Sequence, residues 1–119
     1  MKLSGIMLGS QNAKKLADFY TKILGKPGWH DGDWFGYSAG ANLIIGPHSE
    51  VKGMNDTPGR IMVAFDVTDV PKEFDRIKAL GAKVIAKPYN PNKDNPDVWI
   101  ATFADTDGNY FQLATPWKE

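Results

Sequence analysis

A chain of 119 residues is long enough to bury one sizeable hydrophobic core and too short for two ordinary independent domains. Its hydrophobic fraction of 42% and charged fraction of 24% are those of a globular protein, which excludes a disordered, fibrous or membrane-spanning chain. Fourteen basic residues balance fourteen acidic ones, so no net positive field attracts nucleic acid or anionic lipid. We therefore expect one soluble domain with neither a nucleic-acid nor a membrane partner.

The cellular compartment is addressed by two absences in the sequence. No apolar run approaches the roughly 20 residues needed to cross a bilayer, and the first residues turn polar where a secretory signal would stay apolar. The chain has no cysteine, which removes disulfides, thiolate nucleophiles and cysteine-based zinc sites. These features fit the reducing cytoplasm, and we expect a cytoplasmic protein.

The first half of the chain predicts a strand, a helix and a hairpin. The apolar run Lys2–Gly9 is typical of a strand, and apolar residues at spacings of three and four predict an amphipathic helix over 13–24. Trp34–Ser38 and Asn42–Gly46 are typical of two strands joined by a short turn. The segment Trp29–Asp33 is interpreted as a turn that carries solvated polar side chains.

The helix has signals at both ends. Asn12 is a good N-cap, because its side chain can accept a hydrogen bond from the first free amides, and Gly25 suits the residue that ends the helix. Residues 47–59 have no period and contain two prolines and two glycines. We interpret them as a linker between a module of residues 1–47 and a module of residues 59–119.

The second half repeats this order. A strand over 60–67 leads to a helix that starts after Asp69 and ends before Gly81. Three further strands are expected over 82–87, 98–104 and 110–115, with a loop over 88–97 and a turn over 105–109. Because Leu24-Gly25 and Leu80-Gly81 end the two helices in the same way, the pattern indicates a duplicated unit.

Three segments carry a resemblance to a known family: Ala17–Gly25, Ala64–Val70 and Phe103–Leu113. In their order and spacing the chain resembles the vicinal oxygen chelate (VOC) family of glyoxalases, bleomycin resistance proteins and dioxygenases. The resemblance implies an α+β fold in which two βαβββ modules form a curled mixed sheet around a concave cavity, with the helices outside. It also implies association into a homodimer.

Strand alternation indicates which side chains face that cavity. Ile61, Val63 and Phe65 form one apolar face suited to packing against a helix, and Phe111 and Leu113 do the same in the last strand. The residues between them are then left for the cavity. We expect a mostly apolar surface with a few polar points.

The resemblance also implies where a divalent metal would be held, namely at one residue in the first and last strand of each module. Those positions are Gly5, Ile44, Met62 and Gln112 in this chain. Only the amide of Gln112 offers a ligand that suits a hard cation. The two histidines lie in turn and linker sequence, and Asp105 and Asp107 are interpreted as turn residues. We therefore expect no metal and no other cofactor.

Two functions from different classes follow from these residues. The first is a metal-independent protein that encloses a small apolar or aromatic molecule, like the bleomycin resistance branch. The second is a VOC enzyme, of the lactoylglutathione-lyase, isomerase or dioxygenase type, with an atypical site built on Gln112 or with Asp66 as a base. No catalytic residue can be assigned. The predicted ligand-binding residues are Met7, Trp34, Asn42, Ile44, Met62, Asp66, Trp99, Phe103, Tyr110 and Gln112.

The loop over 88–97 is the main difference between the two modules. It carries three prolines and lies between two strands expected to form the cavity. Loops on a rigid sheet are common places for binding specificity. We expect this loop to form a rim or lid, with Tyr89 as an aromatic wall.

Overall fold

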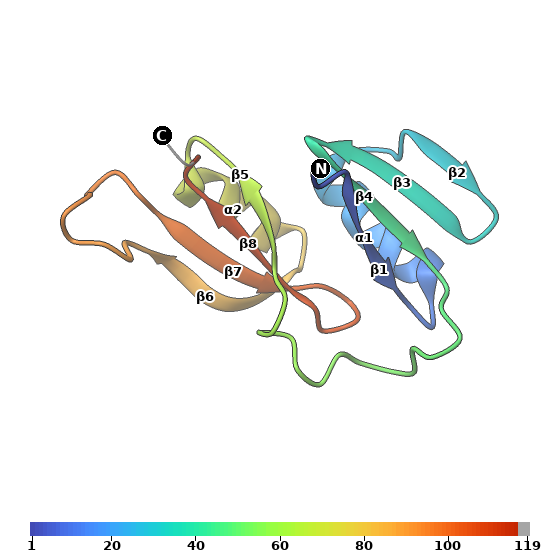
Figure 1. The fold of residues 1–119 in the computed structure, drawn as a ribbon. Coiled ribbons are helices and arrows are strands. Elements are labelled where there is room, and N and C mark those ends of the chain that lie inside the picture. The colour runs from blue at the N-terminus through green and yellow to red at the C-terminus, as the bar shows by residue number, and fades with distance from the viewer. Residues whose placement is uncertain (117–119) are drawn as a thin grey trace. The chain divides into compact units, whose positions relative to one another are not determined.

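The computed structural model describes residues 1–116 and shows an α+β protein made of two similar modules (Figure 1). The chain divides into two compact units, the first spanning Met1–Met54 and the second beginning at Asn55. Each unit has the same element order: a strand, a helix and three strands. Within the described range neither helix is long and apolar enough to cross a membrane.

The first unit is a four-stranded sheet with one helix. Its elements are β1 (Gly5–Gly9), α1 (Ala13–Leu24), β2 (Trp29–Asp31), β3 (Trp34–Ala39) and β4 (Ala41–Gly46). The strands lie in the order β1-β4-β3-β2, with β1 parallel to β4 and the other pairs antiparallel.

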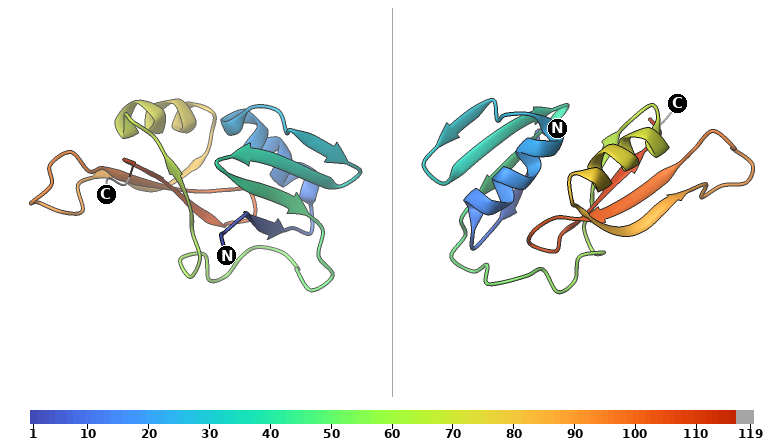
Figure 2. Two further views of the ribbon diagram at one scale, coloured as in Figure 1. Left: turned by 45° about the horizontal axis from the view of Figure 1, so that its top comes forward. Right: turned by 180° about the vertical axis from the view of Figure 1, so that it is seen from behind.

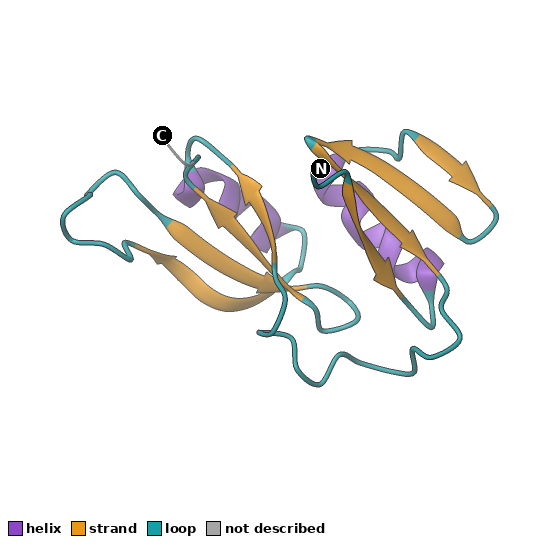
Figure 3. Ribbon diagram, viewed as in Figure 1, coloured by secondary structure: helices purple, strands orange, loops and turns teal. Residues whose placement is uncertain are grey.

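The second unit repeats this topology. Its elements are β5 (Val63–Asp66), α2 (Val70–Ala79), β6 (Lys83–Tyr89), β7 (Ile100–Ala104) and β8 (Tyr110–Ala114). The strand order is β5-β8-β7-β6, and again only the first and last strands of the unit pair in parallel. The two separate sheets, each with one helix, confirm the predicted pair of βαβββ modules (Figure 3).

Helix α1 packs against one face of its sheet. The side chain of Asn12 accepts a hydrogen bond from the Lys15 backbone at 3.2 Å, which confirms the N-cap. At the other end Gly25 has φ +88, a conformation that favours glycine, and its N–H donates to the Thr21 carbonyl. The buried side of the helix contains Leu16, Ala17 and Tyr20.

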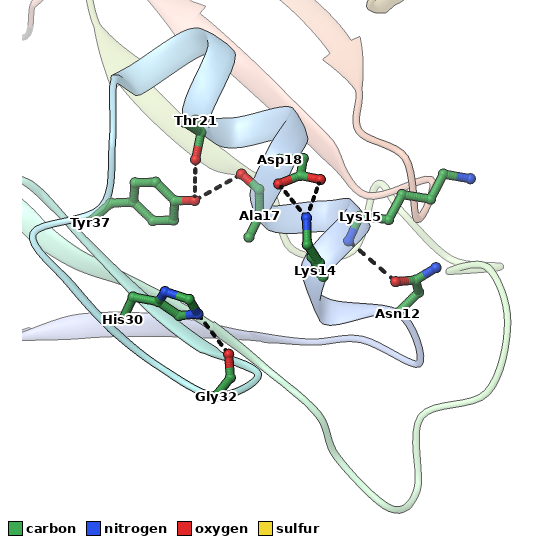
Figure 4. Close-up of polar contacts among 9 residues, drawn as sticks. All are labelled: Asn12, Lys14, Lys15, Ala17, Asp18, Thr21, His30, Gly32 and Tyr37. Atoms are coloured by element: carbon green, nitrogen blue, oxygen red, sulfur yellow. Dashed lines mark hydrogen bonds and ion pairs between the residues drawn. The ribbon is translucent and has the colours of Figure 1, made fainter.

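Tyr37 joins the sheet of the first unit to this helix. Its ring is buried on β3, and its hydroxyl donates to the Ala17 carbonyl at 2.8 Å (Figure 4). The Thr21 hydroxyl lies 2.9 Å from the Tyr37 hydroxyl oxygen. The hydrogen bonds satisfy a phenol that burial would otherwise leave without water.

Stacked aromatic rings form the core of the second unit. Phe103 lies between Phe74 of α2 and Phe111 of β8, with ring centroids 5.0 and 5.6 Å apart. Phe65 meets Phe111 edge to face at 6.0 Å. Val70 and Ile77 of α2 are buried with them. The helix-facing side of each sheet is therefore the hydrophobic core of its own unit.

The structure corrects three details of the sequence prediction. Trp29–Asp31 is a strand rather than part of a turn, because it pairs with Trp34–Gly36 of β3. Strand β6 continues through Pro88 to Tyr89, which is possible because an edge strand leaves one side of its backbone unpaired. Ile61 precedes β5 and is 73% exposed, so the apolar face against the helix begins only at Val63.

Hydrogen bonds tie the connecting segment to the unit on either side. The Gly53 amide donates to the Gln11 side chain at 2.8 Å. The Asn55 amide donates to the Asp107 carbonyl at 2.8 Å, and the Asn55 side chain donates to Asn109 at 2.9 Å. Met54, 64% exposed, lies between these anchors.

The burial of Tyr37 makes a testable contribution to the pH dependence of stability. Burial raises the pKa of the Tyr37 phenol above its ordinary value of 10.0, the hydrogen bond from Thr21 opposes this, and nearby Asp18 adds to it. The raised pKa means that the unfolded chain loses this proton first as the pH rises. The stability that the neutral phenol provides is therefore complete below pH 10.0 and declines as the pH rises above it.

We expect Tyr37→Phe to lower the free energy of unfolding by about 0.5–1.5 kcal/mol at neutral pH, because the two hydrogen bonds of the hydroxyl are lost. The difference between wild type and variant should shrink above pH 10.0, since only the wild type has this ionisation to suppress. Urea unfolding of both proteins at several pH values measures it. A difference that stays constant through the alkaline range would contradict the prediction.

Candidate ligand-binding faces

The sheet of the first unit has one face turned away from its helix, here called the first open face. Phe35, Tyr37, Leu43 and Ile45 are buried on the helix side. Alternation along the strands therefore gives the opposite side to their neighbours, and the register of β1 and β4 confirms that Met7 lies beside Ile44. The strand positions on this face are Gly5, Met7, Gly9, Trp29, Asp31, Trp34, Gly36, Ser38, Asn42, Ile44 and Gly46.

Two tryptophans of this face lie directly on glycines of neighbouring strands. A Cβ atom added to Gly36 would fall 2.1 Å from Nε1 of Trp29, and one added to Gly46 would fall 2.3 Å from Cε3 of Trp34. Each indole thus occupies the space that a side chain would otherwise take. Trp29 remains 49% exposed and Trp34 38%. Such packing supports a sheet, and it also leaves part of each ring accessible from outside.

The second open face is the corresponding side of the sheet in the second unit. Gln112 lies at its middle, between Ala64 of β5 and Thr102 of β7. Tyr110 is half-buried two residues earlier on β8, and Asp66 is exposed at the end of β5. Met62 immediately precedes β5 and is also exposed. The structure thus brings Asp66, Tyr110 and Gln112 to one side of this sheet.

Two predicted ligand-binding residues lie elsewhere. Phe103 is fully buried on the helix side, where it stacks on Phe74 and Phe111, so it belongs to the core. The reason is its register, since Phe103 pairs with Phe111 across the β7–β8 hairpin and must share its side of the sheet. Trp99 precedes β7, is partly exposed and pairs through its backbone with Thr115, outside the strand positions of the second open face.

The residues present do not fit the divalent metal that the resemblance implies. A side chain at Gly5 has no room, because its Cβ would lie 2.7 Å from the carbonyl oxygen of Asn42. Ile44 and Met62 offer no ligand suited to a hard cation, which leaves Gln112 alone. Across residues 1–116 no three histidine, cysteine, aspartate or glutamate side chains gather as a metal site would require.

The two histidines have structural contacts. The His30 ring stacks on Phe35 with centroids 4.4 Å apart, and its Nε2 lies 2.7 Å from the Gly32 carbonyl (Figure 4). His48 accepts a hydrogen bond from the Glu50 amide at 3.1 Å.

Asp105 accepts hydrogen bonds from the Asp107 and Asn109 amides at 2.9 and 3.0 Å, which is the geometry of a hairpin turn.

The segment expected to act as a lid is a short braced loop. It joins β6 to β7 and extends past the end of the second sheet (Figures 1 and 2). The Asn90 side chain donates to the Asn95 carbonyl at 2.9 Å and accepts from the Asn92 amide at 2.9 Å. Tyr89 belongs to β6 and is partly exposed. These local hydrogen bonds restrict the conformation of the loop.

Sequence reasoning left Trp29 and Asp31 out of the site. Both lie on β2, which was interpreted as a turn, and their place on the first open face follows only from pairing with β3. The signal was present in the alternation of Trp29, Asp31 and Trp34 around Gly32-Asp33, a tight-turn pair between two short aromatic segments.

The fold defines a class of protein, an α+β domain of two βαβββ modules with one open sheet face in each. A family model described as a glyoxalase-like domain matches residues 5–114. The chain therefore belongs to the glyoxalase-like domain family, within the VOC superfamily. No curated protein matches the chain.

Solved structures share this fold at low sequence identity. A "conserved domain protein" superposes with a TM-score of 0.80 at 18% identity, over 98% of this chain and 100% of that one. A glyoxalase/bleomycin resistance protein/dioxygenase family enzyme from Burkholderia phytofirmans superposes with a TM-score of 0.75 at 20% identity, over 97% of this chain and 98% of that one. TioX from Micromonospora superposes with a TM-score of 0.69 at 15% identity, over 97% of this chain and 98% of that one. These similarities establish the fold alone.

The crowding at Gly5 predicts a local loss of stability. We expect Gly5→Ala to destabilise the protein by about 1–3 kcal/mol, the usual range for overpacking, because the new methyl group meets backbone that a side-chain rotation cannot move. Gly59→Ala is the matched control, since a Cβ there meets nothing within 4 Å. Urea unfolding of both variants compares them. Equal stabilities would show that Gly5 has room for a side chain and for a metal ligand.

Proposed function

We propose that this protein binds a small apolar or aromatic molecule on the open faces of its sheets and does so without a metal. The observation that carries the proposal is the first open face, where Trp29 and Trp34 lie on glycines with their outer surfaces accessible. Met7, 42% exposed, lies on the same face. Large apolar side chains gathered on one exposed surface are typical of a binding site.

The second open face adds polar groups to this proposal. Gln112 can donate and accept hydrogen bonds, Tyr110 can do the same through its phenol, and Asp66 can accept. A few polar groups on a mostly apolar surface orient a ligand and provide specificity. Proteins of this fold include one named for the glyoxalase, bleomycin resistance and dioxygenase family, which is consistent with both binding and catalytic members.

We also infer a homodimer in the cytoplasm. The exposed apolar residues of the open faces support association, because uncovered apolar surface favours contact with a second chain. The absence of cysteine from the sequence supports a reducing compartment. Sedimentation equilibrium at two protein concentrations is expected to give twice the chain mass of 13.1 kDa. A single species of chain mass at both concentrations would overturn the dimer.

The neutral fluorescent probe N-phenyl-1-naphthylamine tests apolar binding. We expect its emission to rise on addition of the protein and to saturate. Ile44→Ser should weaken binding by about tenfold, roughly 1.4 kcal/mol, because Ile44 lies at the middle of the first open face beside Met7 and Gly36. Met54→Ser, in the exposed connecting segment, is the control and should leave binding unchanged. Absence of saturable binding to the wild type would overturn the proposal.

Elemental analysis of the purified protein tests the metal-independent part. We expect divalent metal well below one ion per chain, because only Gln112 of the four family positions can act as a ligand. The enzyme alternative predicts the reverse. Stoichiometric metal that a chelator removes together with a measured activity would overturn the binding function in favour of a VOC enzyme.

A further inference from the structure

The paired tryptophans of the first open face define a surface of particular size. Trp29 lies on Gly36, which pairs with Ile44 of β4, and Trp34 lies on Gly46, two residues further along the same strand. Gly36 and Gly46 are therefore diagonal neighbours, a relation that corresponds to about 7–8 Å in an antiparallel pair. One six-membered ring is too small to cover both positions, whereas a fused system of three rings spans them.

The same surface has a single formal charge. Among the strand positions of the first open face, Asp31 is the one charged residue, and its backbone lies opposite Trp34. No lysine or arginine occupies those positions. A carboxylate beside two indoles attracts a positive charge, and the face of an indole does so as well. The Asp31 carboxylate would repel a flat anion instead.

We propose that the ligand of this face is a flat, fused-ring cation, with Trp29 and Trp34 as the stacking surface, Asp31 as the counter-charge and Gly36 and Gly46 as positioning residues. This inference rests on the function proposed above and names the chemical class of its ligand. The two glycines act through the tryptophans, because a side chain at either position would displace the indole that lies on it.

Four probes separate ring size, charge and general apolar binding. Proflavine is a three-ring cation, anthracene-2-carboxylate a three-ring anion and benzamidine a one-ring cation, while N-phenyl-1-naphthylamine reports apolar binding as such. Equilibrium dialysis gives each dissociation constant. We expect proflavine to bind at least tenfold more tightly than the anthracene or the benzamidine, with an affinity that falls as salt is added.

Variants connect this preference to the named residues. Trp29→Ala and Trp34→Ala should each weaken proflavine binding at least fivefold. Asp31→Asn should lower the affinity for proflavine toward that for the anthracene, and Asp33→Asn, in the adjoining turn, should leave it unchanged. Gly36→Ala and Gly46→Ala should reduce the ratio of proflavine to benzamidine affinity. Gly28→Ala is their control, since its nearest neighbour would lie 3.8 Å away.

The near-ultraviolet circular dichroism of the glycine variants provides a readout of indole position. We expect the tryptophan bands to change in Gly36→Ala and Gly46→Ala and to persist in Gly28→Ala. If a glycine variant fails to fold, the tryptophan and Asp31 variants carry the test, because they introduce no added atoms that crowd the sheet.

The outcomes distinguish this inference from the proposed function. Equal affinity for proflavine and the anthracene would overturn the charge preference, and equal affinity for proflavine and benzamidine would overturn the two-indole surface. If N-phenyl-1-naphthylamine binds while proflavine binds no better than its analogues, the ligand class is wrong and the binding function stands. If none of the four probes binds, both are wrong.

Discussion

The packing of one helix against one side of each sheet is the constraint on which the candidate site depends. In the first unit α1 buries Leu16, Ala17 and Tyr20 against the β3 and β4 residues of the same side. In the second unit Phe74 of α2 completes an aromatic stack with β7 and β8. Burial on that side supplies the main stabilisation of each unit, so the opposite side needs no large core residue.

This difference in burial explains the composition of the helix side and the open side of each sheet. The buried residues on the helix side are mostly apolar, as at Leu43 and Ile45. The open side combines glycine, methionine, tryptophan, asparagine and glutamine, a mixture with little value for a core. Its glycines have a further effect, because they let Trp29 and Trp34 lie close to the sheet. Their positions are better explained by what lies over them than by any need for backbone flexibility.

Element order was accessible from the sequence because local signals are strong. Asn12 and Asp69 mark the two helix starts, and both caps are present in the structure. Strand β2 was missed because three residues carry too little periodic signal, and its identity depends on pairing with β3. The side of the sheet on which Phe103 lies could have been found, since the turn over 105–109 fixes its partner as Phe111.

The candidate site was harder to predict from the sequence, because its main contacts join residues on different strands. Met7, Asn42 and Ile44 followed from simple alternation within regular strands, and the register agrees. The relation of Trp29 to Gly36 and of Trp34 to Gly46 involves residues on different strands, and no local pattern encodes the close approach of an indole to a glycine. The crowding of Gly5 by Asn42 is another cross-strand effect of this kind.

The anchored connecting segment bears on how such a chain arises. Each unit contains a core of its own. The hydrogen bond of Gly53 attaches the segment to Gln11 of the first unit, and that of the Asn55 side chain attaches it to Asn109 of the second. A backbone break at Met54 would therefore interrupt no helix or strand. The chain has the architecture expected of two half-length ancestors fused in tandem. Its gene could be split at the Met54 codon and the two halves co-expressed.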